Sequence, residues 1–311
     1  MNKTAFWLML TGAVALSSCN SDPIDKDNSI FDTTPPNRTE FDNWLLENYV
    51  KPYNIEFKYK FEDIESDYNY HLTPAKVEKS IILAQVVKKV WLESYDEVAG
   101  PQFTKSYAPR LIYLVGSGAY NGEGSVVLGT AEGGLKVTLY LVNNLQTDPI
   151  VPEDLNFYYF HTMHHEFGHI LHQTIAYDPA FKLISNGKYV SGDWIYEARK
   201  GDSEAQKQGF ISAYAMNQAD DDFVETYSFY VTYSKEWWRK MLVTAGAEEE
   251  KKDGNLTGEL ILKDGALTIS NKLESIRTYF QNVWNIDIDE MRDVILRRSD
   301  EAIKEKFLTF K

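Results

Sequence analysis

The residues best suited to chemistry in this chain are five of its six histidines, which fall between positions 161 and 172. Their centre is the run H-E-F-G-H from His165 to His169, which has the form H-E-x-x-H. Because residues four apart share one face of a helix, His165 and His169 can direct their imidazoles at one metal ion. Glu166 follows the first ligand, where it can act as general base on a metal-bound water. The pattern indicates a zinc hydrolase.

A later acidic segment offers the third ligand that a catalytic zinc needs beside an open position for water. Asp221 and Glu225 are four residues apart in a segment expected to be helical, so they face the same way. By the pattern of gluzincin peptidases, Asp221 binds zinc and Glu225 hydrogen-bonds a ligand histidine. Glu225 is the alternative ligand, because aspartate is one methylene shorter than the usual glutamate. Asp220 and Asp222 are expected to cap the helix.

Two other continuations of the motif are excluded by the residues around it. The metzincin pattern needs a glycine and a histidine where this chain has His172 and Ile175. A di-iron carboxylate bundle needs a second E-x-x-H motif, and the chain contains none.

Four more residues near the motif have several interpretations. Tyr214 lies seven positions before Asp221, where its phenol can stabilise a developing oxyanion, although a core position is an equal alternative. His161 is interpreted as a neighbour of the ligands or of the substrate groove. His164 is interpreted as a hydrogen-bonded core residue, and His172 as a residue that flanks the cleft.

Three segments resemble a known family, the zinc-binding metallopeptidase lipoproteins of Gram-negative gut-type bacteria, which are commonly encoded beside glycan-uptake lipoproteins. More distantly, the same segments resemble the catalytic domain of anthrax lethal factor. The segments are H-E-F-G-H at 165–169, S-A-Y-A at 212–215 and D-D-F-V-E at 221–225, and the C-terminal block with W-N-I-D-I-D at 284–289 also looks like this family.

The resemblance implies a zincin-like fold and one Zn²⁺ per chain. It implies that Tyr214 is the oxyanion tyrosine, Asp221 the zinc ligand and Glu225 the acid that orients a ligand histidine. The family usually shows E-D-F-A-E in the last segment, so Asp221 and Val224 depart from its pattern.

The N-terminus predicts export and a lipid anchor. Lys3 precedes an apolar run at 5–16 that is too short to span a bilayer. The run ends in L-S-S-C at Cys19, the one cysteine of the chain, and resembles the lipobox of bacterial lipoproteins. The alternative is an ordinary signal peptide with an incidental cysteine. We expect a protein anchored through Cys19 to the bacterial outer membrane, on its periplasmic or outer face.

Composition excludes two classes of partner. A net charge of −14 repels phosphate backbones, so we expect no nucleic acid. The glycines between 116 and 124 lack the G-x-G-x-x-G spacing, and a strand is expected after them, so we expect no nucleotide.

The fold class expected is α+β, with a signal peptide at 1–18, a flexible tether at 19–39 and one catalytic domain at 40–311. Its part at 40–177 mixes helices with a small sheet, and its part at 178–311 is mainly helical. Helices are predicted at 41–49, 73–94 (with Val77 buried), 152–176, 220–238, 270–284, 287–298 and 299–309. Strands are predicted at 55–61, 110–115, 125–129 and 135–142. The segment 178–213 is expected to be irregular, and 245–254 to be a charged loop.

The leading functional hypothesis is zinc-dependent hydrolysis of a peptide or glycoprotein. The strand at 135–142, if it forms the sheet edge over the cleft, can bind substrate by backbone pairing. A close neighbour such as that edge also accounts for Gly168 within the motif helix. The alternatives are a non-catalytic surface lipoprotein that captures glycan or glycoprotein, and a metal-storage or sensing protein.

Overall fold

The computed structural model describes residues 37–120, 126–127, 129–132, 135–147, 150–253 and 255–310, with backbone alone at 126–127 and 129–132. The chain divides between Arg38 and Thr39, and the second unit contains the elements described below. The predicted signal peptide, Cys19 and most of the tether lie outside the described residues. Among the helices described, none combines the length and the apolar character that a membrane span requires. The predicted α+β class is confirmed.

A four-stranded sheet forms the β part, in the order β1-β2-β6-β5. The first three strands are parallel, and β5 pairs antiparallel with β6 at the edge. The inner strands β2 and β6 bury every side chain after the first residue, as expected for strands covered on both faces. The bounds are β1 (Glu56–Lys58), β2 (Leu111–Leu114), β5 (Gly129–Glu132) and β6 (Lys136–Leu139); β3 (Ala119–Tyr120) and β4 (Val126–Val127) form a separate pair.

The condition on which substrate pairing with the strand at 135–142 depended, a position at the sheet edge, is not met. That segment is β6, which has β2 on one side and β5 on the other, so its backbone groups are paired within the sheet. The edge belongs to β5, which also packs near the motif helix. Local pattern predicts that strands exist, but their order depends on long-range pairing.

The N-terminal helices pack their apolar faces on the sheet and on one another. Thr39 starts the first helix with a capping box to Asp42. Trp91 and Tyr95, on the long second helical segment, are almost fully buried. The elements are α2 (Glu40–Leu45), a π-helical turn (Leu46–Val50) and α3 (Lys51–Tyr53), then α4 (Val77–Val87), a π-helical turn (Lys88–Leu92) and α5 (Glu93–Val98), followed by α6 (Pro101–Tyr107).

The second helical segment begins later than predicted. Pro74 forms a β-bridge to Val115 instead of opening the helix, and the amide of Gly116 donates to the Thr73 carbonyl at 2.8 Å. The helix starts at Val77, whose side chain is 49% exposed and not buried as predicted. Pairing with the sheet thus outweighs the local helix-start signal of Thr73 and Pro74.

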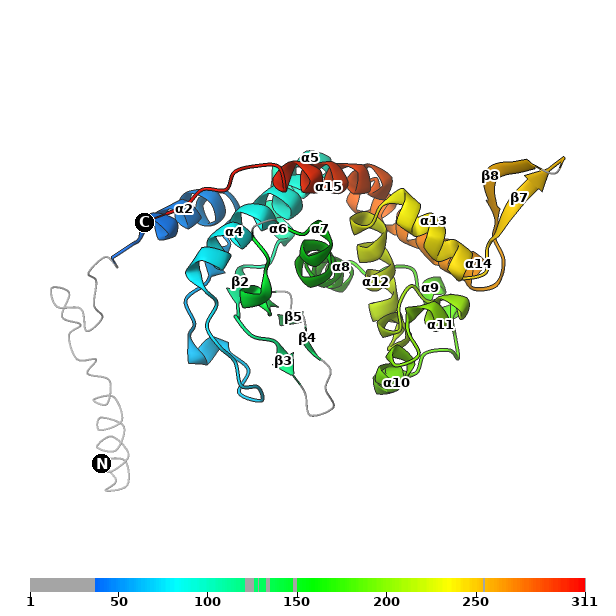
Figure 1. The fold of residues 1–311 in the computed structure, drawn as a ribbon, viewed down its shortest axis with the longest axis horizontal. Helices are drawn as coiled ribbons and strands as arrows, with labels where there is room; N and C mark the ends of the chain where they lie inside the picture. The colour runs from blue at the N-terminus through cyan, green and yellow to red at the C-terminus, as the bar shows by residue number, and fades with distance from the viewer. Residues whose placement is uncertain are drawn as a thin grey trace, which may run out of the picture. The chain divides into compact units, whose positions relative to one another are not determined.

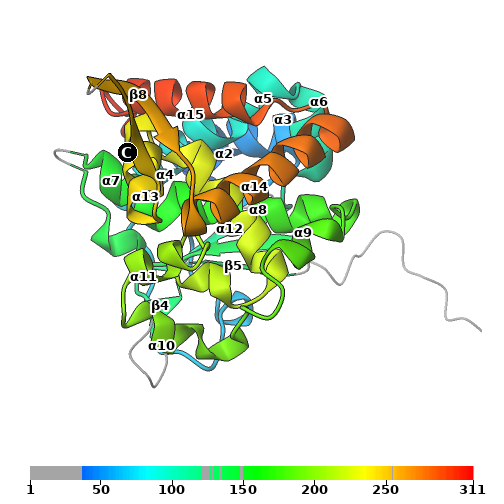
Figure 2. The ribbon, with the colours of Figure 1, turned by 90° about the vertical axis from the view of Figure 1, so that its right-hand side faces the viewer.

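The motif lies on a long helix that packs against a second helix. Residues 152–174 form α7 (Pro152–Leu155), a π-helical turn (Asn156–Phe160) and α8 (His161–Thr174), as the sequence predicted. Alongside α8 lies α12 (Ala219–Thr232), and Figures 1 and 2 show the two helices side by side.

Gly168 marks the closest approach of these two helices. A Cβ atom added there would lie 2.8 Å from Cγ1 of Val224 on α12, which is too close for a real contact. The close neighbour that the sequence predicted for Gly168 is therefore α12, in place of the sheet edge given as an example. Glycine is needed because α12 packs against this turn of α8, and the close packing holds the acidic residues of α12 opposite the histidines.

The helix that follows the acidic cluster is shorter than predicted. Tyr233 has an extended backbone, and Ser234 accepts a hydrogen bond from the amide of Trp237 as the N-cap of a new helix. The predicted helix through residue 238 is therefore two helices, α12 and α13 (Lys235–Thr244).

The C-terminal part differs from prediction in several further places. The segment 178–213, predicted to be irregular, contains three short α-helices, and the helix predicted to begin at 270 begins at Asp264. The expected charged loop at 245–254 contains a strand of an antiparallel hairpin, which extends from the ends of α13 and α14 in Figure 1. The expected helices at 287–298 and 299–309 are one helix that ends at Ala302. The bounds are α9 (Ala180–Ile184), α10 (Trp194–Ala198), α11 (Asp202–Lys207), β7 (Glu248–Lys252), β8 (Asn255–Ile261), α14 (Asp264–Tyr279) and α15 (Ile288–Ala302).

Candidate metal centre

Two imidazoles and one carboxylate meet where α8 packs on α12. The rings of His165 and His169, one turn apart on α8, have centroids 4.9 Å apart. Across from them, Oδ1 of Asp221 lies 3.3 Å from Nε2 of His169. The three side chains offer ligand atoms that all lie within 4.8 Å of one another. Two histidine nitrogens and one carboxylate oxygen are a donor set that catalytic zinc takes in proteins, so these residues fit the ion.

Glu225, one turn after Asp221, holds the first imidazole from the other side. Its Oε2 accepts a hydrogen bond from Nδ1 of His165 at 2.7 Å, and Nε2 of His161 lies 3.1 Å from the same oxygen. Its Oε1 accepts from the hydroxyl of Ser212 at 2.8 Å. This arrangement leaves Nε2 of His165 as the nitrogen available to a metal ion. His161, His165 and Glu225 also lie within 4.8 Å of one another, so a second grouping of possible ligands shares His165.

The second imidazole has a partner that sequence reasoning missed. Nδ1 of His169 lies 2.9 Å from Nε2 of His172, three residues further along α8. Burial, together with the nearby His169, lowers the pKa of His172 to about 4, so that its ring is neutral near pH 7 and can accept a hydrogen bond. The i, i+3 spacing was the signal that could have predicted this contact.

Both carboxylates are ionised near neutral pH despite their burial. Burial by itself would raise the pKa of Asp221, but hydrogen bonds with His169 and Asn217 outweigh it and hold the pKa below its usual value. Burial likewise opposes ionisation of Glu225, and the facing His161 and His165 hold its pKa far below the usual range. Glu225 in turn raises the pKa of His165 against the effect of burial. Negative charge is therefore concentrated beside the imidazoles, as a cation site requires.

Glu166 and Tyr214 lie beside this cluster. Glu166 is partly exposed, and none of the described residues forms a hydrogen bond or ion pair with it. Tyr214 lies in a 3₁₀ turn (Tyr214–Met216) before α12, with its ring 5.6 Å from that of His165 and edge-on to Trp194. Burial, with Asp221 and Glu225 nearby, raises the pKa of the Tyr214 phenol, so it stays protonated and can donate.

The neighbouring acids do not cap α12 as predicted. The N-cap position is Gln218. Asp220 pairs instead with Lys182 at 3.1 Å. Asp222 forms a fully buried ion pair with Lys272 of α14 at 2.7 Å, and this pair ties α12 to the C-terminal helices.

His164 is the hydrogen-bonded core residue that the sequence predicted. Its Nδ1 lies 2.9 Å from the hydroxyl of Tyr95, which lies 2.7 Å from the hydroxyl of Tyr227. Burial lowers the pKa of His164 to about 3, so the ring is neutral in the core. This residue helps position α8 and belongs to no group of possible metal ligands among the described residues.

Comparison with known proteins agrees with the resemblance noted in the sequence. The model of a family described as "Putative zinc-binding metallo-peptidase" matches residues 34–289. A solved structure of a putative zinc-binding metallo-peptidase from Bacteroides caccae ATCC 43185 is 41% identical, with a TM-score of 0.71 over 89% of this chain and 98% of that chain. The comparison with curated proteins gave no match. Since the family model spans most of its length, the chain belongs to the putative zinc-binding metallo-peptidase family.

Proposed function

We propose that this protein hydrolyses peptide bonds, with one zinc ion held by His165, His169 and Asp221. The observation that carries the proposal is the convergence of two imidazoles and an ionised carboxylate from two packed helices. When bound, zinc lowers the pKa of a water molecule to about 7 and polarises a carbonyl group.

Glu166 is the general base of the proposed reaction. It neighbours His165 in the motif, and its carboxylate is not engaged by any described side chain. A carboxylate oxygen of Glu166 takes a proton from the attacking water and then delivers it to the nitrogen of the leaving amine. Tyr214 donates its phenolic hydrogen to the oxygen of the scissile carbonyl as negative charge develops there.

Asp221 is the preferred third ligand because the two acids differ in their existing contacts. Both oxygens of Glu225 have close partners, since Oε2 faces His165 and His161 while Oε1 accepts from Ser212. Oδ2 of Asp221 accepts from Asn217, while Oδ1 lies 3.3 Å from Nε2 of His169, beside the ring nitrogen that could also bind the ion. Glu225 then orients His165, as carboxylates behind metal-bound histidines commonly do.

The experiment that tests the proposal compares the wild-type protein with Glu166→Gln. Both are loaded with zinc, checked for one ion per chain, and incubated with casein. We expect cleavage by the wild type that a chelator abolishes and zinc restores, and a Glu166→Gln variant that binds zinc but loses at least about a hundredfold in rate. Equal cleavage by both proteins would remove Glu166 from the mechanism. The absence of any chelator-sensitive cleavage would favour the non-catalytic binding protein.

We propose further that the protein is anchored to the bacterial outer membrane by a lipid on Cys19. The support is the apolar run that ends in L-S-S-C at the single cysteine. Metabolic labelling with a radioactive fatty acid should mark the wild-type chain and not a Cys19→Ser variant. Equal labelling of both would place the lipid elsewhere.

A further inference from the structure

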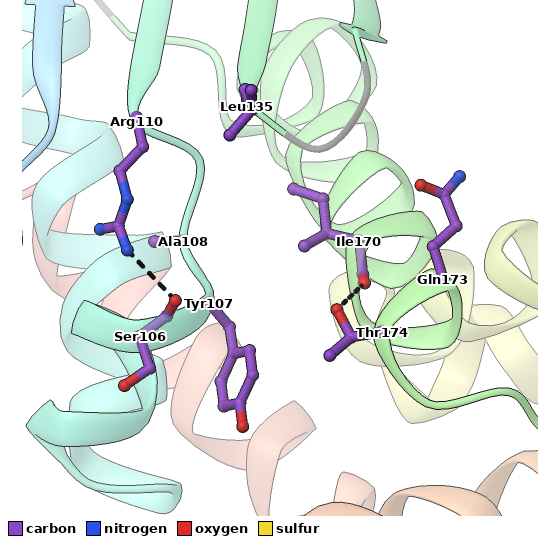
Figure 3. Close-up of a pocket in the computed structure, with 8 residues that line it drawn as sticks. All are labelled: Ser106, Tyr107, Ala108, Arg110, Leu135, Ile170, Gln173 and Thr174. Carbon is purple, nitrogen blue, oxygen red and sulfur yellow. Dashed lines mark hydrogen bonds between the residues drawn. The ribbon is translucent and has the colours of Figure 1, made fainter.

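A pocket of about 390 Å³ lies beside the C-terminal half of α8. Its walls come from three parts of the fold, as Figure 3 shows. The end of α6 and the start of β2 contribute Ser106, Tyr107 and Arg110, the turn before β6 contributes Leu135, and α8 contributes Ile170 and Gln173. Such a volume suits a side chain or a small group of a larger ligand.

The pocket lies along the same face of α8 as the proposed general base. Ile170 is four residues and Gln173 seven residues after Glu166, and these spacings place all three on one helical stripe. At 1.5 Å per residue, Ile170 and Gln173 lie about 6 and 10 Å further along the helix axis. An extended peptide covers that span in about two to three residues. The edge strand β5 also packs near α8, and an extended peptide can pair with such an edge.

The pocket has a positive charge with unused hydrogen-bond donors. Nη1 of Arg110 donates to the carbonyls of Lys105 at 2.9 Å and Tyr53 at 3.3 Å, and Nη2 donates to that of Ser106 at 3.3 Å. A guanidinium has five N–H groups, so Nε–H and one N–H of Nη2 remain without a partner among the described residues. Two adjacent N–H groups of a guanidinium are the fork that grips a carboxylate through both of its oxygens.

The surroundings leave that charge unneutralised. The described side chains that line the pocket include Arg110 and no acidic residue. Arg110 forms no ion pair with any described carboxylate, in a chain whose net charge is −14. Gln173 and Tyr107 also line the pocket, and Figure 3 shows their polar ends directed away from the Arg110 guanidinium, which leaves Arg110 as the group that can hold a carboxylate.

We propose that this pocket is a subsite for a carboxylate of the substrate, about two to three residues from the scissile bond, with Arg110 as the residue that selects it. The inference rests on the proposed peptidase function for the position of the scissile bond. The carboxylate comes from an aspartate or glutamate side chain of the substrate or from its C-terminus, since both present the same group to the guanidinium.

The test measures peptide binding apart from cleavage. Zinc-loaded, immobilised Glu166→Gln protein is incubated with random decapeptides in two arms, one with amidated and one with free C-termini, and the retained peptides are sequenced. We expect about tenfold enrichment of glutamate over glutamine at one position in the amidated arm if the side chain is the ligand, since a charge-assisted contact supplies roughly that factor. Enrichment confined to the free-terminus arm would identify the terminal carboxylate.

Two variants and one control keep the test decisive. Adding Arg110→Met should reduce the preference for a carboxylate to about twofold or less. Adding Gln173→Glu, which puts a negative charge in the same pocket and changes no described hydrogen bond, should abolish or reverse the preference even if Arg110→Met does not fold. The control is Arg239→Met, since Arg239 also donates to a backbone carbonyl but lies on α13, outside the pocket; its preference should stay near tenfold.

The outcomes separate this inference from the proposed function. If the wild type cleaves nothing while Glu166→Gln shows the Arg110-dependent preference, the peptidase proposal fails and the carboxylate subsite stands. If the wild type cleaves peptides but no carboxylate is preferred in either arm, or if Arg110→Met and Gln173→Glu leave the preference unchanged, the subsite is overturned and the peptidase proposal stands.

Discussion

The two acids of α12 have different predicted roles, and exchanging each for its amide separates those roles. Asp221→Asn removes the charge of the proposed zinc ligand and keeps its shape. Glu225→Gln does the same for the residue that holds His165. If Asp221 is the ligand and Glu225 the orienting residue, Asp221→Asn should lose more zinc affinity than Glu225→Gln. In the zinc-free protein, Glu225→Gln should lose more stability than Asp221→Asn.

The magnitudes follow from the contacts of each carboxylate. Loss of a residue that orients a metal ligand typically costs about 10-fold to 100-fold in affinity, so Glu225→Gln should fall in that range and Asp221→Asn should exceed about 100-fold. Without zinc the order reverses. Glu225 accepts from His165 and Ser212 in a fully buried site with His161 close by, and an amide would place N–H groups against donors, at a cost of about 3 kcal/mol. Asp221 has a hydrogen bond from Asn217 and a longer, weaker one with His169, so we expect about 1 kcal/mol.

The assay measures zinc dissociation constants by competition with a fluorescent chelator, and unfolding free energies in urea with the metal removed. Asp220→Asn is the matched control, because Asp220 is a partly exposed neighbour on the same helix turn that pairs with Lys182. It should change zinc affinity by less than about threefold. A larger loss of zinc affinity in Glu225→Gln than in Asp221→Asn would refute the assignment and make Glu225 the ligand.

Three further outcomes follow from the structure. Tyr214→Phe should keep zinc binding and KM while kcat for peptide cleavage falls about 100-fold, and an unchanged kcat would remove the phenol from the mechanism. Gly168→Ala should destabilise the protein by about 1–2 kcal/mol in urea unfolding, because its Cβ would lie 2.8 Å from Cγ1 of Val224. The same change in a Val224→Ala background should cost less, because Cγ1 is gone and only the Val224 Cβ, at 3.1 Å, remains close; destabilisation of equal size in both backgrounds would contradict this packing. The pKa of His164 is lowered from 6.5 to about 3 in the folded protein, so between these values the ring is protonated in the unfolded chain and neutral in the folded one. Acid therefore stabilises the unfolded state, and the free energy of unfolding falls as the pH falls. His164 should account for about 2 kcal/mol of the unfolding free energy that the zinc-free wild type loses between pH 7 and pH 5. Zinc-free His164→Asn should therefore lose about 2 kcal/mol less over the same range. Equal losses in both proteins would show that His164 is charged in the core.

The arrangement of the candidate site was easier to predict than the fold around it. The positions of His165, Glu166 and His169 follow from helical periodicity alone, because the whole motif lies on one helix. Asp221 and Glu225 were identified as candidate site residues from their spacing and from the family resemblance. These two acids lie beside the histidines only because α12 packs on α8, and no local sequence pattern reveals that packing.

Errors in the predicted fold came from interactions between distant residues. Pro74 pairs with Val115 instead of starting a helix, and β6 is interior because β5 pairs along its other side. Asp222 was interpreted as a helix cap, but its partner is Lys272, fifty positions away in the sequence. A capping signal describes one turn of chain, and it cannot report a buried cation supplied by another helix.

The hairpin of β7 and β8 was missed for a different reason. The segment 248–252 reads E-E-E-K-K, and its charged residues are poor strand formers by composition. Both strands are largely exposed, so no alternation of apolar residues marks them, and backbone pairing with an ion pair between Arg239 and Glu249 holds the hairpin to α13. Exposure removes the pattern on which strand prediction depends.

The central claim is that one zinc ion joins His165, His169 and Asp221, and a crystal structure of the zinc-loaded protein with anomalous data at the zinc edge tests it most directly. The account predicts a single strong anomalous peak about 2.0–2.2 Å from Nε2 of both histidines and from a carboxylate oxygen of Asp221. A peak coordinated by His161 and Glu225 instead, or no peak between α8 and α12 in a protein shown to contain zinc, would contradict it.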